Sequence, residues 1–113
     1  MDIKKTVDVL GTKYKIVFHN RQEDTILSQA DGYCDWSSKT IVICKNLDSN
    51  IGDIEYAYKK ILRHELTHAI LHESGLDVCT GETTAWALNE EMVDFWSIQG
   101  LKLYQIWVKA GAV

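Results

Sequence analysis

The pattern of apolar and polar residues separates the chain into a first part with the period of strands and a second part with the period of helices. In the segment 13–19 every second residue is apolar, as in a strand with one buried face. The segments 4–10 and 13–19 flank the turn residues Gly11 and Thr12, which predicts either a short hairpin or a single strand after a turn. The residues expected to face the core from the second strand are Tyr14, Ile16 and Phe18.

A second hairpin is predicted farther along the chain. The segments 32–36 and 40–44 are rich in aromatic and β-branched residues and flank the polar turn 37–39. The polar stretch 20–29 before them fits either a loop or a short helix. These segments predict a small antiparallel or mixed sheet of about three or four strands.

A long helix is predicted over residues 53–74. Its apolar residues recur at intervals of three and four, which is the period of one helix face. Asp53 is suited to cap the first turn, and Gly75 is suited to follow the last one. The apolar stripe consists of Ile54, Tyr58, Ile61, Leu62, Leu66, Ala69 and Ile70.

Two further helical segments are predicted after it. One runs from Thr84 to about Ser97, and the other is a short helix over residues 101–109 that follows Gly100. In the last segment core packing is expected in preference to partner binding. The positions expected to face inward are Ala85, Leu88, Met92, Val93 and Trp96 in the first segment and Leu103, Tyr104, Trp107 and Val108 in the second.

Length and composition indicate one globular domain, residues 1–113. The chain is 46% hydrophobic and 25% charged, which is an ordinary balance, and its net charge of −4 argues against a nucleic-acid-binding surface. No apolar stretch is long enough to cross a bilayer, and the first residues lack the apolar segment of a signal peptide. We therefore expect a cytoplasmic protein that does not contact the membrane. The sequence does not predict its oligomeric state.

The cysteines also indicate a reducing compartment. The chain has three cysteines, namely Cys34, Cys44 and Cys79. Because their number is odd and none of them forms a C-x-x-C pair, neither a disulfide framework nor a cysteine zinc site is indicated. Reduced, buried thiols are expected, although Cys34 and Cys44 are candidates to face each other across the second hairpin.

The long helix contains the motif His64-Glu65-Leu-Thr-His68. Residues four apart lie on one helix face, so His64 and His68 are able to direct two imidazole nitrogens at one metal ion. Glu65 is offset around the helix and is placed to reach a water on that ion as a general base. The alternative is that these side chains lie on a solvated face and bind no metal.

The next helical segment contains Asn89-Glu90-Glu91-Met92-Val93-Asp94, and here the chain resembles the gluzincin metallopeptidases. The resemblance implies Glu90 as the third zinc ligand and Asp94 as an outer partner. Asp94 is one turn beyond Glu90, where it is able to accept a hydrogen bond from a ligand histidine. Glu91 is the alternative ligand, since adjacent residues cannot both face the metal. Two histidines and one carboxylate leave a fourth position open, as in catalytic zinc sites.

Among small zincins the chain is most similar to the ImmA/IrrE-like metallopeptidases and other minimal phage or prophage zincins. This resemblance implies an α+β, zincin-like fold, in which a small sheet packs on the two metal-binding helices. The chain departs from the pattern at Val93, where alanine is usual, and at Trp96, where phenylalanine is expected. We also expect no attached DNA-binding or sensor domain, so the resemblance does not imply the substrate or the regulation.

His72 is not expected to be a zinc ligand. A metzincin would need glycine at position 71 and histidine at position 74, and the chain has Leu71 and Ser74. A histidine in the last turn of a helix more often interacts with the helix dipole or forms a local hydrogen bond. His72 and Tyr33 are the weak candidates for a donor that stabilises an oxyanion.

These features predict a zinc-dependent endopeptidase with one Zn²⁺ per chain and a protein or peptide substrate. In zincins an edge strand near the metal holds an extended peptide, and one arm of residues 32–44 is the candidate. Tyr33 and Trp36 would either line a pocket there or simply pack on the sheet, and packing is favoured. The alternatives are a zinc-binding interaction module without significant catalysis and a structural protein with a chance motif.

Overall fold

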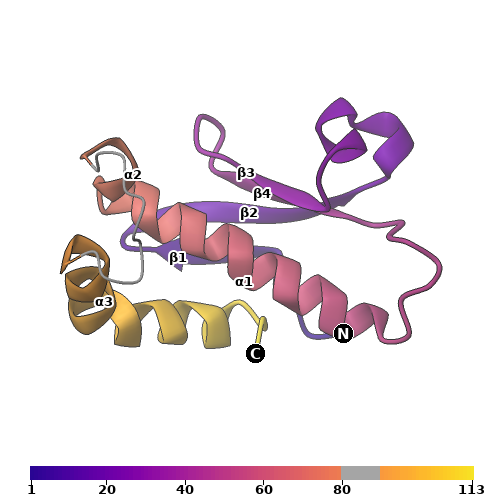
Figure 1. Cartoon of the computed structure of the whole chain (residues 1–113). Coiled ribbons are helices and arrows are strands. Elements are labelled where there is room, and N and C mark those ends of the chain that lie inside the picture. Colours follow the sequence, from indigo (N-terminus) through magenta and orange to yellow (C-terminus); the bar gives the residue numbers. More distant parts are fainter. Residues whose placement is uncertain (80–89) are drawn as a thin grey trace.

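The computed structural model of the chain describes residues 1–79 and 90–113, except the side chains of residues 78, 79, 90, 93, 94 and 97. A four-stranded mixed sheet and two long helices make up a small α+β fold (Figure 1). None of the described helices combines the length and the apolar character that a membrane crossing requires.

The sheet consists of the two predicted hairpins. Strands β1 (Thr6–Val9) and β2 (Thr12–His19) are antiparallel, as are β3 (Gly32–Asp35) and β4 (Thr40–Cys44). The hairpins join through β2 and β4, which run parallel, so the strand order is β1-β2-β4-β3. Both hairpins and the mixed sheet are therefore confirmed, and β3 is an edge strand.

The two faces of the sheet are covered differently. The helices cover one face, and the main core lies between them and the sheet (Figure 1). The stretch 20–29 forms two 3₁₀ turns, η1 (Arg21–Glu23) and η2 (Thr25–Ser28), and Leu27 packs on the opposite face. This stretch is thus neither a plain loop nor an α-helix. Because β4 is covered on both faces, its residues read as an unbroken apolar run.

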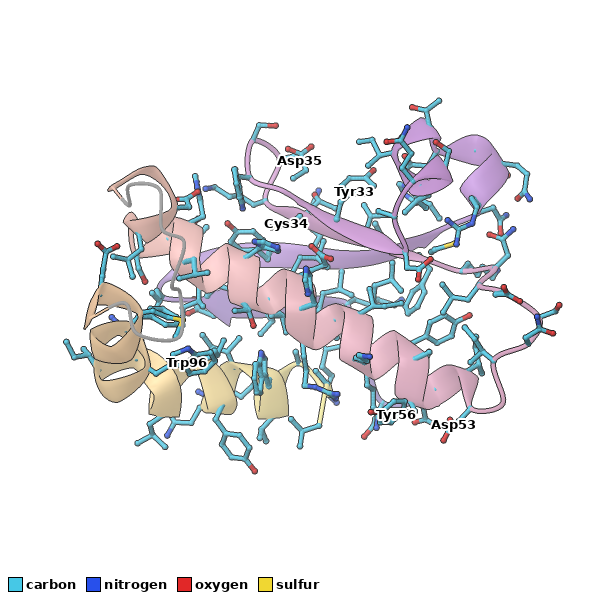
Figure 2. The ribbon with its side chains drawn as sticks, viewed as in Figure 1. Tyr33, Cys34, Asp35, Asp53, Tyr56 and Trp96 are labelled. Carbon is cyan, nitrogen blue, oxygen red and sulfur yellow. The ribbon has the colours of Figure 1, made fainter. Side chains whose placement is uncertain are left out.

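Helix α1 (Ile54–Glu73) crosses the sheet and has the predicted ends. Figure 2 shows Asp53 and Tyr56 at its amino end, where the Asp53 carboxylate accepts a hydrogen bond from the Tyr56 backbone N–H at 3.0 Å. Gly75, just past the last turn, has a φ of 77°, a conformation that glycine adopts without strain. Most of the predicted stripe is buried, but Ile54 remains 42% exposed.

The carboxylate of Glu73 ties the end of α1 to the sheet. It accepts hydrogen bonds from the Thr12 hydroxyl at 2.8 Å, the Tyr14 hydroxyl at 2.7 Å and the Lys39 ammonium at 2.9 Å. These hydrogen bonds lower the pKa of Glu73 to about 2, and the one from Tyr14 has the largest effect, followed by the one from Lys39. The charged form of Glu73 is therefore part of the folded structure.

Helix α2 (Leu76–Cys79) is a single turn, whereas α3 (Glu90–Lys109) is long and continues through Gly100. The prediction of a separate short helix after Gly100 is wrong. Among the predicted inward positions of the segment 84–97, Trp96 is wrong, because it is 45% exposed and Phe95 is buried instead. Ala85, Leu88 and the side chain of Val93 lie outside the described residues. The buried side chains described for α3 lie on one face on both sides of Gly100, namely Phe95, Leu103 and Ile106, and Ala110 follows the helix.

The opposite side of α3 is unusually apolar. Tyr104 is 52% exposed and Val108 is 50% exposed, so the prediction that these two side chains face the core is wrong. Leu103 is buried and Trp107 packs against the core, as predicted.

Candidate metal centre

His64 and His68 converge on the exposed side of α1. Their Nε2 atoms are 3.2 Å apart, and the two rings are inclined by 68°. Two nitrogens bound to one tetrahedral zinc ion at ~2.05 Å would be about 3.3 Å apart, so the observed separation suits a shared metal ion. The same distance also suits a hydrogen bond between the rings. Burial, and then repulsion by His64, lower the pKa of His68 and favour its neutral form.

Glu65 completes a cluster with the two histidines. Its carboxylate lies within 4.8 Å of their ligand nitrogens, and together they form a group of side chains able to hold a metal ion. Glu65 is only 7% exposed, and this burial raises the pKa of its carboxyl group. The three residues of the predicted motif are therefore gathered on α1 in a group that could hold a metal ion.

The rest of the predicted ligand set is not tested by the structure. The side chains of Glu90 and Asp94 lie outside the described residues, so their roles remain predictions. Glu91 is exposed and does not belong to the cluster. In the described part of the chain, His64, Glu65 and His68 form the one cluster of this kind.

Gly32 allows β3 to lie close to the metal centre. A Cβ atom added at this position would be 2.6 Å from Cγ2 of Ile61, 2.9 Å from the carbonyl oxygen of Val42 and 3.6 Å from Cγ of Glu65. Contacts below 3.0 Å are not tolerated, so α1 packs directly on the backbone of β3 only because residue 32 has no side chain. Gly32 therefore sets the distance between the edge strand and Glu65.

Two hollows flank the histidines and Glu65, and both include His64, Glu65 and Gly32 in their walls. The first, which we call the aliphatic hollow, has a volume of about 390 Å³ and is completed by Ala30, Asp31, Leu47, Ile51, Ala57, Lys60 and Ile61. The second, the aromatic hollow, has a volume of about 300 Å³ and is completed by Tyr33, Cys34, Trp36 and His68.

Trp36 is positioned by His72. The two rings are parallel within 2° and their centroids are 4.6 Å apart. His72 in turn is held by Asp77, whose carboxylate is 2.8 Å from the His72 Nδ1 atom. The expectation that His72 forms a local hydrogen bond is confirmed. The expectation that Trp36 simply packs on the sheet is only half right, because the indole is 38% exposed and lines the aromatic hollow.

Tyr33 is engaged elsewhere. Figure 2 shows Tyr33, Cys34 and Asp35 in succession along β3, and side chains alternate between the faces of a strand. The Tyr33 hydroxyl donates to the Asp24 carboxylate at 2.5 Å, and its ring packs near Leu27 on the sheet face opposite α1. In this arrangement the Tyr33 hydroxyl is not placed to stabilise an oxyanion. Tyr33 packs on the sheet as expected, and it also forms part of the wall of the aromatic hollow.

The two described cysteines are free and do not face each other. Cys34 is the register partner of Ile41, and it packs on the α1 side, whereas Cys44 belongs to the cluster on the other face. Burial, followed by the charge of Glu65, raises the pKa of the Cys34 thiol to about 12. The raised pKa favours the protonated form of the Cys34 thiol, which lies beside the candidate metal centre.

Several residues of the site were not predicted from the sequence. Gly32 carried a usable signal, since a glycine at the start of a strand often marks a close approach of another segment. Lys60 also carried a signal, since it lies one helical turn before His64 on the predicted helix. Asp77 and Ile51 carried none, because they lie outside α1 and no strand or helix pattern pairs them with the site.

We compared the chain with family models, with curated proteins and with solved structures. No significant match was found in any of the three. The site must therefore be interpreted from its own geometry.

Gly32→Ala is expected to destabilise the fold by about 1–3 kcal/mol, because the added methyl group overpacks the contact between β3 and α1. Urea denaturation of both proteins measures this difference. Gly52→Ala is the matched control, since a Cβ atom there meets nothing within 4 Å. Equal losses in the two variants would show that the close approach at Gly32 is not a constraint.

Proposed function

We propose that this chain is a minimal zincin-type metallopeptidase domain, which hydrolyses a peptide bond in a dedicated protein substrate with one Zn²⁺ per chain. The observation that carries the proposal is the convergence of the two Nε2 atoms at 3.2 Å beside the buried carboxylate of Glu65. Two imidazoles with a carboxylate as third ligand form a donor set that suits catalytic zinc.

The residues have separate roles in this proposal. His64 and His68 would hold the ion, with Glu90 as the third ligand on the basis of the sequence resemblance. When bound, zinc would supply Lewis-acid chemistry at this site, which acidifies water and polarises a carbonyl group. Glu65 would take a proton from the attacking water as general base and would then donate it to the departing amine. Its low exposure keeps bulk water away from this transfer.

The free edge of β3 is the proposed binding site for the substrate backbone. β3 is an edge strand, and its first residue, Gly32, is in both hollows beside the histidines. An extended peptide added to this edge would gain main-chain hydrogen bonds and would pass directly over the metal centre. Side chains of the peptide would then enter the hollows on either side.

A second candidate function is a zinc-binding interaction module that has little or no catalytic activity. The observation that favours it is the position of the two candidate oxyanion donors, because Tyr33 is bonded to Asp24 and His72 to Asp77. Without such a donor, hydrolysis would be slow.

The first test is metal analysis of the purified protein by native mass spectrometry. We expect one zinc ion per chain in the wild type and none in His64→Ala or His68→Ala. His19→Ala is the matched control, since His19 pairs with Asp24 away from the cluster. Substoichiometric metal in the wild type would reject both candidate functions.

The second test is mass spectrometry of new peptide termini in a cell lysate incubated with the zinc-loaded protein.

A further inference from the structure

We propose that the aliphatic hollow selects a substrate residue with an aliphatic side chain next to the cleaved bond, and that Lys60 at its rim pairs with an acidic group close to that residue. This inference rests on the proposed peptidase function and specifies its substrate class. It concerns residues outside the metal cluster.

The position of the hollow relates it to the reacting bond. His64 and Glu65 form part of its wall, so a side chain bound in it is adjacent to the atoms that the metal centre acts on. Gly32, the first residue of the edge strand β3, also forms part of the wall, so the hollow borders this edge. A peptide that extends along β3 therefore reaches this hollow with the residue nearest the metal.

The walls of the aliphatic hollow favour an aliphatic side chain of the substrate. Leu47 and Ile51 line it from the segment before α1, and Ala57 and Ile61 line it from α1 itself. Ile51 is 37% exposed, so its side chain has apolar surface left for a ligand. A single methylene group in an apolar pocket changes the specificity constant by about 10–200-fold.

The rim of the hollow carries a cation without an internal partner. Lys60 is exposed, and no ion pair of Lys60 is present among the described residues. The α1 residues three or four positions away, which are its helical neighbours, are not acidic: Tyr56, Ala57, Arg63 and His64. The acidic residue at the same rim, Asp31, is already bonded to Arg21 at 2.8 Å. An acidic group on the substrate would complement Lys60.

The aromatic hollow offers a different chemistry. Its walls contain Trp36, which is held by its stack on His72, and the protonated thiol of Cys34. The two sides of the metal centre thus present unlike surfaces, and an extended peptide would bind in one direction in preference to the other. The aliphatic and acidic preference should consequently appear on one side of the cleaved bond only.

The test uses a peptide library prepared by digesting a bacterial proteome, incubated with the zinc-loaded full chain and analysed by mass spectrometry. In wild-type cleavage sites we expect Leu, Ile or Val at one position next to the cleaved bond and Asp or Glu close to it. Ile51→Glu should lower the aliphatic preference at least tenfold, and Lys60→Glu should reverse the acidic preference. Ile26→Glu and Lys13→Glu are matched controls, because Ile26 is an exposed aliphatic residue and Lys13 an exposed lysine outside the hollow.

The outcomes separate this inference from the proposed function. Cleavage with the same profile in the wild type, Ile51→Glu and Lys60→Glu would overturn the inference and leave the peptidase intact. If the wild type cleaves nothing, the peptidase is rejected, and retention of the same library on immobilised protein becomes the readout. Retention of aliphatic and acidic peptides that is lost in Ile51→Glu supports the hollow as a binding site, whereas absent or unchanged retention overturns it.

Discussion

Glu65→Gln is expected to reduce hydrolysis by about 10²–10⁴-fold while zinc remains bound at one ion per chain. The amide has nearly the same size and shape as the carboxylate but cannot accept the proton of the attacking water. His64 and His68 keep their places on the helix in this variant, so metal binding is unaffected. The measurements are the rate at which new peptide termini form and the zinc content by native mass spectrometry.

This variant also distinguishes the two candidate functions. A binding module would keep its partner binding after Glu65→Gln, whereas a peptidase would lose its effect on the substrate. Glu55→Gln, on the exposed first turn of α1, is the matched control and should change neither quantity. Undiminished cleavage by Glu65→Gln would show that another residue acts as the base.

Glu73→Gln is expected to lower the free energy of unfolding at pH 7 by about 2–3 kcal/mol. The folded state lowers the pKa of this carboxyl group from 4.5 to about 2, so the charged form stabilises the fold above pH 4.5. That contribution is lost as the pH falls from 4.5 toward 2, because in this range the carboxyl group takes up a proton in the unfolded chain while it stays charged in the folded protein. Urea denaturation of both proteins at several pH values measures the effect.

The difference between the wild type and Glu73→Gln should therefore be largest near neutral pH and should shrink in acid. Glu55→Gln serves as the control here as well, since Glu55 is an exposed residue 3.5 Å from Lys59 and such pairs contribute less than about 1 kcal/mol. A difference that stays constant from pH 7 to pH 3 would mean that the hydrogen bonds to Glu73 do not depend on its charge.

The elements that depend on local sequence were predicted well. The hairpin turn at Gly11, the cap at Asp53 and the left-handed residue Gly75 each act within a few residues, and each is present where it was expected. The same holds for His64 and His68, because one helical turn is enough to bring them together.

The features that depend on long-range packing were not predictable. Gly100 costs a helix about 1 kcal/mol relative to alanine, and burial of Phe95 and Leu103 on one continuous helix outweighs that cost. Sheet packing of Tyr33 and a local hydrogen bond of His72 were predicted, but the contacts of Tyr33 with Asp24 and of His72 with Trp36 were not. These contacts join separate segments, and the strand and helix patterns do not pair these segments with one another.

The shortness of β3 has a consequence for how copies of this protein behave in solution. A bare strand edge is a template on which other chains tend to aggregate, and proteins commonly limit this risk with short or charged edges. β3 is four residues long and ends at Asp35, whose carboxylate is occupied by Ser37 and Ser38. An edge of this length accommodates a brief extended segment and discourages the growth of a continuous sheet from one copy to the next.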